Sequence, residues 1–389
     1  MRHTARTFTT LPDPEAARTL LADIATAPCR FAPVAVDRPL ALYGAGDLGL
    51  LARDFLKAVG RDFDLVIDRR ADELFQSPDW AGVKLLRPDK VPAAEKRSLR
   101  VAVSIVTSPY VAIECALQEL GYTDIVPFYD LAESFRQMHP LSNGWFARPL
   151  THDDERETAR VLAGWTDDVS RAHHLQFLAW RRLREEWLFD RAPVSNGNRF
   201  FIPEVAAILN GHEILLDGGA HHGNVIDAFT RQTSDSYEQI IAIEPDPSNV
   251  VKLRALKPDD TRISIHDWAL SEKEGKAKFH GGLGYASQIS STGKMTVATQ
   301  PLDALGASPT YIKLHLEGRE LDALKGARKT LQANRPIVAA TVYHNADGIW
   351  RTPRWLMDNL PRYRFLFRAH TWCGTGAVVY AIPNERVGT

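Results

Sequence analysis

Two segments of the chain repeat one local order, an apolar strand, a glycine-rich turn and an amphipathic helix, at residues 39–59 and 213–230. Strands joined through helices pair in parallel, so this order predicts parallel sheets with helices on their faces. Each unit is followed by further alternation of strands and helices, which predicts two α/β domains. The 389 residues, 44% of them hydrophobic, supply enough apolar material for two cores.

Composition along the chain divides it into four zones. Residues 1–37 read as an N-terminal helical segment, 38–135 as a smaller Rossmann-like domain, 136–200 as a polar helical linker and 201–389 as a second Rossmann-like domain. The pair His173-His174 in the linker is expected on a solvated helix face. The linker also carries apolar side chains that suit either a homodimer interface or, as we favour, packing between the domains: Leu162, Trp165, Leu175, Phe177, Leu178, Trp180, Leu183 and Trp187.

Charge and cysteine content argue against several classes of protein. The net charge is −1, from 47 basic and 48 acidic side chains, without the basic excess of a nucleic-acid or membrane-surface binder. Apolar runs such as 101–106 are far shorter than the roughly 20 residues that span a bilayer. The three cysteines are too widely spaced for a disulfide framework or a CxxC zinc site, and the N-terminus lacks the apolar stretch of a secretory signal. We therefore expect a cytoplasmic protein without nucleic-acid or membrane partners.

The first glycine-rich turn, Gly44-Ala-Gly-Asp-Leu-Gly49, satisfies GxGxxG between a strand and a helix, and the next strand ends in Asp68. Such a turn lets a phosphate approach the helix N-terminus, while the carboxylate can accept from ribose hydroxyls. A nucleotide or nucleotide-sugar site is one interpretation. The other is a packing or oligomerisation domain whose glycines serve only the turn, and Asp47 favours it because its charge would face a pyrophosphate.

The second turn, Gly218-Gly-Ala-His-His-Gly223, follows a strand that ends in Asp217. Three later strands also end in polar residues, at Glu244, at Asp267-Trp268 and at His315-Leu-Glu317. The carboxyl ends of parallel strands meet at one edge of a sheet, where open α/β sheets bind their ligands. These residues therefore predict a binding site at that edge.

The chemistry of this edge suits a nucleoside without phosphates. The backbone of Gly218, Gly219 and Ala220 can lie flat against an amino-acid moiety, and Glu244 can accept from both ribose hydroxyls. Asp267 can accept from an adenine amino group, and Trp268 can cover the ring. The turn lacks the GK[ST] of a phosphate loop. S-adenosylmethionine fits this set of groups better than ATP or NAD.

Residues from about 200 to 383 resemble the FkbM family of S-adenosylmethionine-dependent methyltransferases. The resemblance rests on ILLDGGAHHG at 214–223, IAIEPDP at 241–247 and IKLHLEGRELDALKGA at 312–327. It implies a class I methyltransferase fold, preceded by the N-terminal extension of a subset of the family, and O-methylation of a sugar or natural-product hydroxyl. It also implies that Asp217, Gly218, Gly219 and Ala220 line the methionine side of the cofactor, Glu244 its ribose, and Asp267 and Trp268 its adenine. The sequence departs from the family at His315, where the family has Asp, and at His221-His222.

Methyl transfer to a hydroxyl benefits from a general base, and three residues are candidates. His315 is the first, His344 the second and Glu317 the third. His315, Glu317 and His344 could instead join Asp347 as a mixed metal site, but no tight ligand spacing supports this, so we expect no metal. The glycine-rich segment 281–293 suits a lid over the acceptor, or a surface hairpin.

The leading interpretation is a methyltransferase acting on a small-molecule or glycan acceptor, with a possible nucleotide or nucleotide sugar at the first domain. The alternative is an NAD(P)- or nucleotide-sugar-dependent oxidoreductase or binding protein that uses Gly44–Gly49 beside a non-catalytic methyltransferase-like domain. The absence of a Tyr-x-x-x-Lys pair near a plausible site argues against one large dehydrogenase class.

Overall fold

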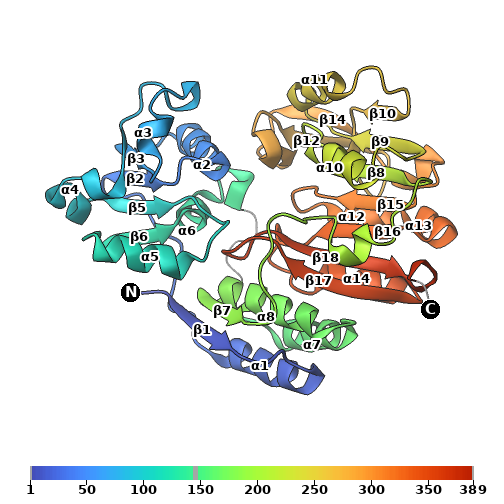
Figure 1. Cartoon of the computed structure of the whole chain (residues 1–389), viewed down its shortest axis with the longest axis horizontal. Helices are drawn as coiled ribbons and strands as arrows, with labels where there is room; N and C mark the ends of the chain where they lie inside the picture. The colour runs from blue at the N-terminus through green and yellow to red at the C-terminus, as the bar shows by residue number, and fades with distance from the viewer. Residues whose placement is uncertain (1, 143–147, 388–389) are drawn as a thin grey trace.

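The computed structural model describes residues 2–142 and 148–387. Figure 1 shows two α/β domains side by side, with a layer of helices below them. The zones expected at 1–37, 136–200 and 201–389 each include residues outside the described part of the chain. Within the described ranges, no helix is both long and apolar enough to cross a membrane.

The first domain is built on a five-stranded parallel sheet with the strand order β4-β3-β2-β5-β6. In chain order this is 3-2-1-4-5, a doubly wound arrangement in which helices cover both faces. The central strands are apolar and buried, as such strands must be. The strands are β2 (Leu40–Tyr43), β3 (Leu65–Ile67), β4 (Leu85–Leu86), β5 (Arg100–Val103) and β6 (Asp124–Pro127). The helices are α2 (Asp47–Ala58), α3 (Ala71–Leu74), α4 (Ala93–Ser98), α5 (Tyr110–Glu119) and α6 (Phe128–Ala132), with short 3₁₀ turns η1 (Pro78–Trp80), η2 (Pro88–Lys90), η3 (Glu133–Phe135) and η4 (Pro140–Ser142).

The N-terminal segment and the linker, which the sequence analysis treated as two separate zones, pack together as one layer. Strand β1 (Thr4–Phe8) pairs in parallel with β7 (Glu185–Phe189), and helix α1 (Pro14–Thr26) packs on α7 (His152–Gly164) and α8 (Asp168–Leu183). Pairing with β1 satisfies the backbone of β7, a strand that the helical interpretation of the linker missed. Figure 1 shows this layer below both domains.

Helix α8 corrects one expectation about the linker. His173 and His174 lie on its buried side, not on a solvated face, with 3% and 0% of their surface exposed. Nε2 of His174 lies 2.7 Å from the carbonyl of Ile349, and its Nδ1 accepts from the indole of Trp165 at 3.0 Å. These bonds let a polar ring occupy the core. The apolar side chains of the linker are likewise covered within one chain, as packing predicts.

The second domain has a seven-stranded sheet with the order β10-β9-β8-β15-β16-β18-β17. Its strands run parallel except β18, which is antiparallel to both of its neighbours. Counted along the chain, this order is 3-2-1-4-5-7-6. The strands are β8 (Ile214–Gly218), β9 (Gln239–Ile243), β10 (Ile263–His266), β15 (Tyr311–Leu314), β16 (Ile337–Thr341), β17 (Tyr363–Ala369) and β18 (Ala377–Pro383). The helices are α9 (Pro203–Ala206), α10 (Asn224–Gln232), α11 (Pro247–Leu256), α12 (Glu320–Lys325), α13 (Arg328–Asn334) and α14 (Arg351–Asn359), with η6 (Leu302–Leu305) and η7 (Asn384–Arg386).

A small four-stranded sheet stands beside the carboxyl edge of the second sheet. Its order is β11-β14-β12-β13, and it contains β11 (Ala269–Leu270), β12 (Gly275–His280), β13 (Gln288–Ile289) and β14 (Met295–Gln300). The glycine-rich segment after β12 includes the 3₁₀ turn η5 (Gly284–Ala286). Asp246, the N-cap of α11, fastens this segment because its Oδ2 accepts from the amide of Gly282 at 2.8 Å and the hydroxyl of Ser287 at 2.7 Å.

Candidate functional site

The turn after β8 requires glycine at its second position. Gly219 has φ +73°, and a Cβ there would lie 2.1 Å from the carbonyl oxygen of His315. Gly223, with φ +87°, leads into α10, and a Cβ there would meet Leu256 at 2.4 Å. The turn therefore packs directly against the end of β15, and a side chain at Gly219 would separate them.

Glu244 holds this turn in place from the end of β9. Its Oε2 accepts from the amide of His221 at 2.8 Å, and its Oε1 accepts from the amide of Asp246 at 2.9 Å. Burial raises the pKa of this carboxyl, while those amide bonds oppose the rise. Oε1 also accepts from the side-chain amide of Asn249 at 3.3 Å, whereas Oε2 keeps a second lone pair with which it can accept from a ligand.

Asp217, which the sequence assigns to the cofactor, faces a buried lysine instead. Nζ of Lys313 on β15 lies 2.7 Å from Asp217 Oδ1 and donates to the carbonyl of Gly219 at 2.9 Å. The two side chains are 0% and 2% exposed. This ion pair ties β8, β15 and the turn together. The lysine was missed, although its place within the apolar strand YIKL is the signal that could have revealed it.

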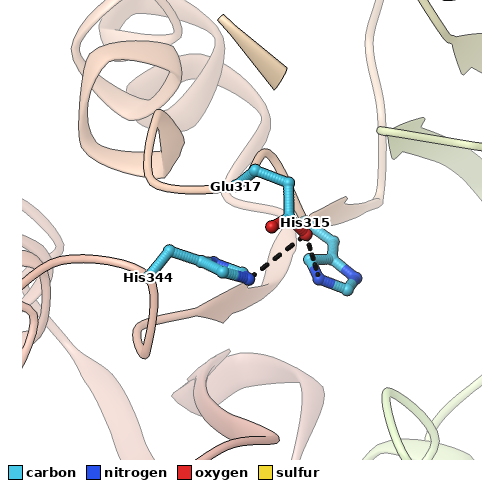
Figure 2. A group of neighbouring side chains, drawn as sticks. All are labelled: His315, Glu317 and His344. Atoms are coloured by element: carbon cyan, nitrogen blue, oxygen red, sulfur yellow. Dashed lines mark ion pairs between the residues drawn. The ribbon is translucent and has the colours of Figure 1, made fainter. Parts of the chain in front are cut away.

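The three candidate bases converge at the ends of β15 and β16. Figure 2 shows the rings of His315 and His344 on either side of the Glu317 carboxylate. Glu317 Oε1 lies 3.1 Å from Nε2 of His315 and 3.2 Å from Nε2 of His344. Glu317 has a left-handed backbone, with φ +50°, and the neighbouring Gly318 has φ +97°. We call His315, Glu317 and His344 the triad.

Burial and mutual contact set the charges of the triad. Burial lowers the pKa of His315 to about 3, against the opposing influence of Glu317. Burial alone would raise the pKa of Glu317, but His344 and His315 hold it well below its usual range. Glu317 in turn raises the pKa of His344 well above its usual value, despite burial. The arrangement is a neutral imidazole and an imidazolium around a carboxylate.

Two residues that the sequence analysis did not select complete the surroundings of the triad. Oε1 of Glu320 lies 3.3 Å from Nδ1 of His344 and accepts from the hydroxyl of Thr341 at 2.6 Å. The hydroxyl of Tyr343 lies 3.0 Å from Nε2 of His315 and accepts from Arg199 at 3.0 Å. Glu320 stands in the quoted motif LEGRELDALKGA, and Tyr343 directly precedes the candidate base His344, so both had a sequence signal.

Two cavities meet at the triad. A pocket of about 70 Å³ is lined by Gly219, Glu244, His315 and Glu317, and by the segment at Gly284–Ile289. A cleft of about 1380 Å³ runs between the domains and is lined by Gly219, Ala220 and His315 on one side. His315 therefore faces both cavities.

Four residues predicted to bind the cofactor do not line these cavities. Asp217 is engaged by Lys313, and Gly218 packs against Leu270 and Leu314. Asp267 is exposed, and Trp268 is buried in the core. Ala269 and Leu270, the residues that follow, line the smaller pocket in their place.

The adjacent histidines of the turn stack on each other, whereas in an extended loop their side chains would diverge. His221 has φ +50°, which turns its ring onto that of His222, with the centroids 3.6 Å apart and the planes at 20°. His222 is fixed by Asn249, whose Oδ1 lies 3.1 Å from its Nε2. His221 lines both the smaller pocket and the cleft, and His222 lines the cleft, so the stacked pair forms part of the wall between the two cavities.

The first glycine-rich turn lies across the same cleft. Gly44, Gly46 and Asp47 line it, opposite His315. Asp68 holds this turn as Glu244 holds the other, because its Oδ2 accepts from the amide of Ala45 at 2.8 Å. Its Oδ1 accepts from the amide of Arg70 at 2.8 Å.

The sheet order 3-2-1-4-5-7-6, its antiparallel strand and the site at its carboxyl edge define a class I methyltransferase fold, as predicted. Residues 217–369 match the family model of the methyltransferase FkbM domain, which confirms the family recognised from the sequence.

Among solved structures, the chain is similar to the methyltransferase FkbM from Methylobacillus flagellatus KT, at 18% identity and a TM-score of 0.60. That match covers 96% of this chain and 94% of the other, so the likeness in fold extends over both domains. Precorrin-6y C5,15-methyltransferase from Geobacter metallireducens GS-15 matches at 12% identity and a TM-score of 0.30, over 50% of this chain and 95% of the other. No curated protein matches the chain in sequence.

Proposed function

We propose that the protein is an S-adenosylmethionine-dependent O-methyltransferase that methylates a hydroxyl of a sugar or natural-product acceptor. One observation carries the proposal: His315 lies between a pocket at the glycine-rich turn and a large cleft. The cofactor would occupy the pocket, with its ribose on Glu244 and its methionine end along Gly219 and Ala220. The acceptor would occupy the cleft. His315 would then stand where donor and acceptor meet.

The chemistry requires little beyond this placement. The acceptor oxygen forms a bond to the sulfonium methyl carbon, the carbon–sulfur bond breaks, and S-adenosylhomocysteine leaves with the electron pair. With the triad as the structure has it, Nε2 of His315 faces the Glu317 carboxylate and carries the proton of the neutral ring, so Nδ1 is the nitrogen that would take the hydroxyl proton. Glu317 would orient the ring, and His344 would hold Glu317. Orientation of donor and acceptor supplies most of the rate enhancement in such a displacement.

The cofactor pocket must open for binding. Its 70 Å³ is well below the roughly 300 Å³ or more of a typical ligand site, and the segment at Gly284–Ile289 forms one wall. The sequence left open whether this segment is a lid over the acceptor or a surface hairpin, and we infer that it is a lid over the cofactor pocket. Asp246 would release Gly282 and Ser287 when it opens.

The first turn supports a further part of the proposal, a nucleotide or nucleotide sugar as the distal end of the acceptor. Gly44 and Gly46 share the cleft with His315, and Arg69 and Arg70 line it beside them. Titration with UDP-glucose in the presence of S-adenosylhomocysteine tests this part. Binding that is lost in R70A would support it, and the absence of binding would remove it.

Isothermal titration of the full chain with S-adenosylhomocysteine tests the main proposal. Saturable binding at one site is expected, and E244A should weaken it. A folded protein that binds neither S-adenosylhomocysteine nor S-adenosylmethionine would refute the proposal and leave the alternative, a binding protein or oxidoreductase that uses Gly44–Gly49.

A further inference from the structure

We propose that the triad binds one divalent first-row transition-metal ion, such as Zn²⁺ or Mn²⁺, through His315, Glu317 and His344. One ligand atom from each residue lies within 4.8 Å of the others. Figure 2 shows that the ring of His344 approaches His315 and Glu317 from a different segment of the chain. This convergence depends on the fold, which is why no tight ligand spacing marks it in the sequence.

Two of the three separations between ligand atoms already fit a single ion, and the nitrogen atoms of the two rings lie within 4.8 Å of each other. Glu317 Oε1 lies 3.1 Å from Nε2 of His315 and 3.2 Å from Nε2 of His344. Ligands about 2.1 Å from a metal stand roughly 3.0 Å apart in octahedral geometry and roughly 3.4 Å apart in tetrahedral geometry. The observed separations fall between these values. Small side-chain movements would therefore suffice to admit an ion.

The donor set indicates which ion. Two imidazoles and one carboxylate form a set that suits first-row transition metals and leaves positions open for substrate. Mg²⁺ and Ca²⁺ prefer oxygen ligands throughout. The triad therefore favours Zn²⁺ or Mn²⁺ over Mg²⁺.

Metal-binding histidines usually have a carboxylate beside the ring nitrogen that does not bind the metal, and Glu320 lies in that position at His344. Its Oε1 lies 3.3 Å from Nδ1 of His344, which leaves Nε2 directed at Glu317. The amide of Leu316 and the hydroxyl of Thr341 hold the same carboxylate oxygen, at 2.9 and 2.6 Å. A carboxylate that fixes the ring and tautomer of a histidine strengthens metal binding.

Charge favours the same conclusion. Glu317 and Glu320 are largely buried, and in the described structure each has histidine as its ion-pair partner. A divalent ion would balance both carboxylates. Asp347, which the sequence-based set included, takes no part, because its Oδ2 pairs with Arg351 at 2.8 Å.

Metal binding would change how the hydroxyl is activated, and this consequence rests on the proposed function. A hydroxyl bound at an open position has a lowered pKa and can release its proton to solvent. The oxygen then attacks the methyl group as described above. His315 would act as a metal ligand and not as the proton acceptor.

The test is titration of tag-free, EDTA-stripped full-length protein with Zn²⁺ and, separately, with Mg²⁺. We expect one equivalent of Zn²⁺ to bind and Mg²⁺ to bind far more weakly. E317Q and H315A should each weaken Zn²⁺ binding by more than about 100-fold, and E320Q by about 10- to 100-fold. H212A is the matched control, because His212 forms an exposed pair with Glu238, at 2.9 Å.

Circular dichroism and thermal unfolding would show that each variant is folded. The proposal is overturned if the wild type binds no stoichiometric Zn²⁺, if E317Q and H315A bind it unchanged, or if H212A loses it equally. Failure of the wild-type protein to bind S-adenosylhomocysteine would count against the proposed function instead. Failure of the metal proposal and failure of the proposed function are therefore distinguishable.

Discussion

The two glycine-rich turns share one construction but differ in what surrounds them. In each domain, a carboxylate at the end of the second strand accepts from one amide of the turn and from the amide two residues further along the chain. This carboxylate is Asp68 in the first domain and Glu244 in the second. The end of the fourth strand differs. It carries Ser104 in the first domain, which donates to the carbonyl of Gly44 at 2.9 Å, and His315 and Glu317 in the second. A shared turn thus specifies a fold, and the residues at the neighbouring strand ends specify the chemistry.

Substitution of the tight glycines should give the largest effect. G219A would place Cβ 2.1 Å from the carbonyl of His315. We expect it to abolish S-adenosylhomocysteine binding and to lower stability by on the order of 3 kcal/mol, because the strained turn must move away from β15. Calorimetric titration and thermal unfolding measure both effects.

Two substitutions in the first turn serve as controls for G219A. G49A places Cβ 2.1 Å from the carbonyl of Gly44, and it should destabilise the first domain without weakening S-adenosylhomocysteine binding. G46A meets no atom within 4 Å and should change neither property. If G49A abolished cofactor binding and G219A did not, the roles assigned to the two turns would be reversed.

The last residue before each turn provides the second comparison. Tyr43 pairs with Val103 in the first domain, whereas Asp217 pairs with Lys313 in the second. K313M leaves a fully buried carboxylate without its cation, which should cost about 3–5 kcal/mol of unfolding free energy. The double variant D217L/K313M restores an apolar pair and should be more stable than K313M in urea unfolding. A double variant no more stable than K313M would contradict this account of the pair.

Acid should loosen the helical layer beneath the second sheet. Burial lowers the pKa of His174 to about 4, so the folded protein excludes a proton that the unfolded chain binds below its usual pKa of 6.5. Stability should therefore fall as the pH drops from 6.5 towards 4, by about 3 kcal/mol from this group. Protonation would also set Nδ1–H against the indole N–H of Trp165.

Hydrogen exchange at pH 5 measures this effect. Exchange should accelerate in α8 and β17 more than in β2 of the first domain. H174Q should reduce the pH dependence of stability by about 3 kcal/mol and leave the part due to other buried histidines such as His173, whose pKa burial also lowers to about 4. H212Q, at an exposed position, should leave the pH dependence unchanged. Equal acceleration in β17 and β2 would argue against His174 as the cause.

Substitution of the two carboxylates at the strand ends, Glu244 and Asp68, should have the smallest effect. E244Q removes the charge proposed to meet the ribose and should weaken S-adenosylhomocysteine binding about 10- to 100-fold. D68N removes the corresponding charge from the first turn and should leave that binding unchanged. Equal losses in both variants would show that the charge acts only through the fold.

The sequence predicted the strands, the turns and the class of fold well, because these depend on local apolar patterns and glycines. It also selected all three residues of the triad, since each follows the end of a strand. It failed for His173 and His174, because the polarity of a residue does not reveal that Ile349 and Ala192 offer it buried carbonyls. It missed the pairing of β1 with β7 and the contact between Lys313 and Asp217, both of which join distant parts of the chain.

A crystal structure of the full chain with S-adenosylhomocysteine would test the central claim most directly. The account predicts the ligand in the pocket at Gly219, with its ribose on Glu244 and its sulfur towards His315, and the segment at Gly284–Ile289 displaced. Ligand bound at Gly44–Gly49 would contradict the claim that the second turn, and not the first, holds the cofactor.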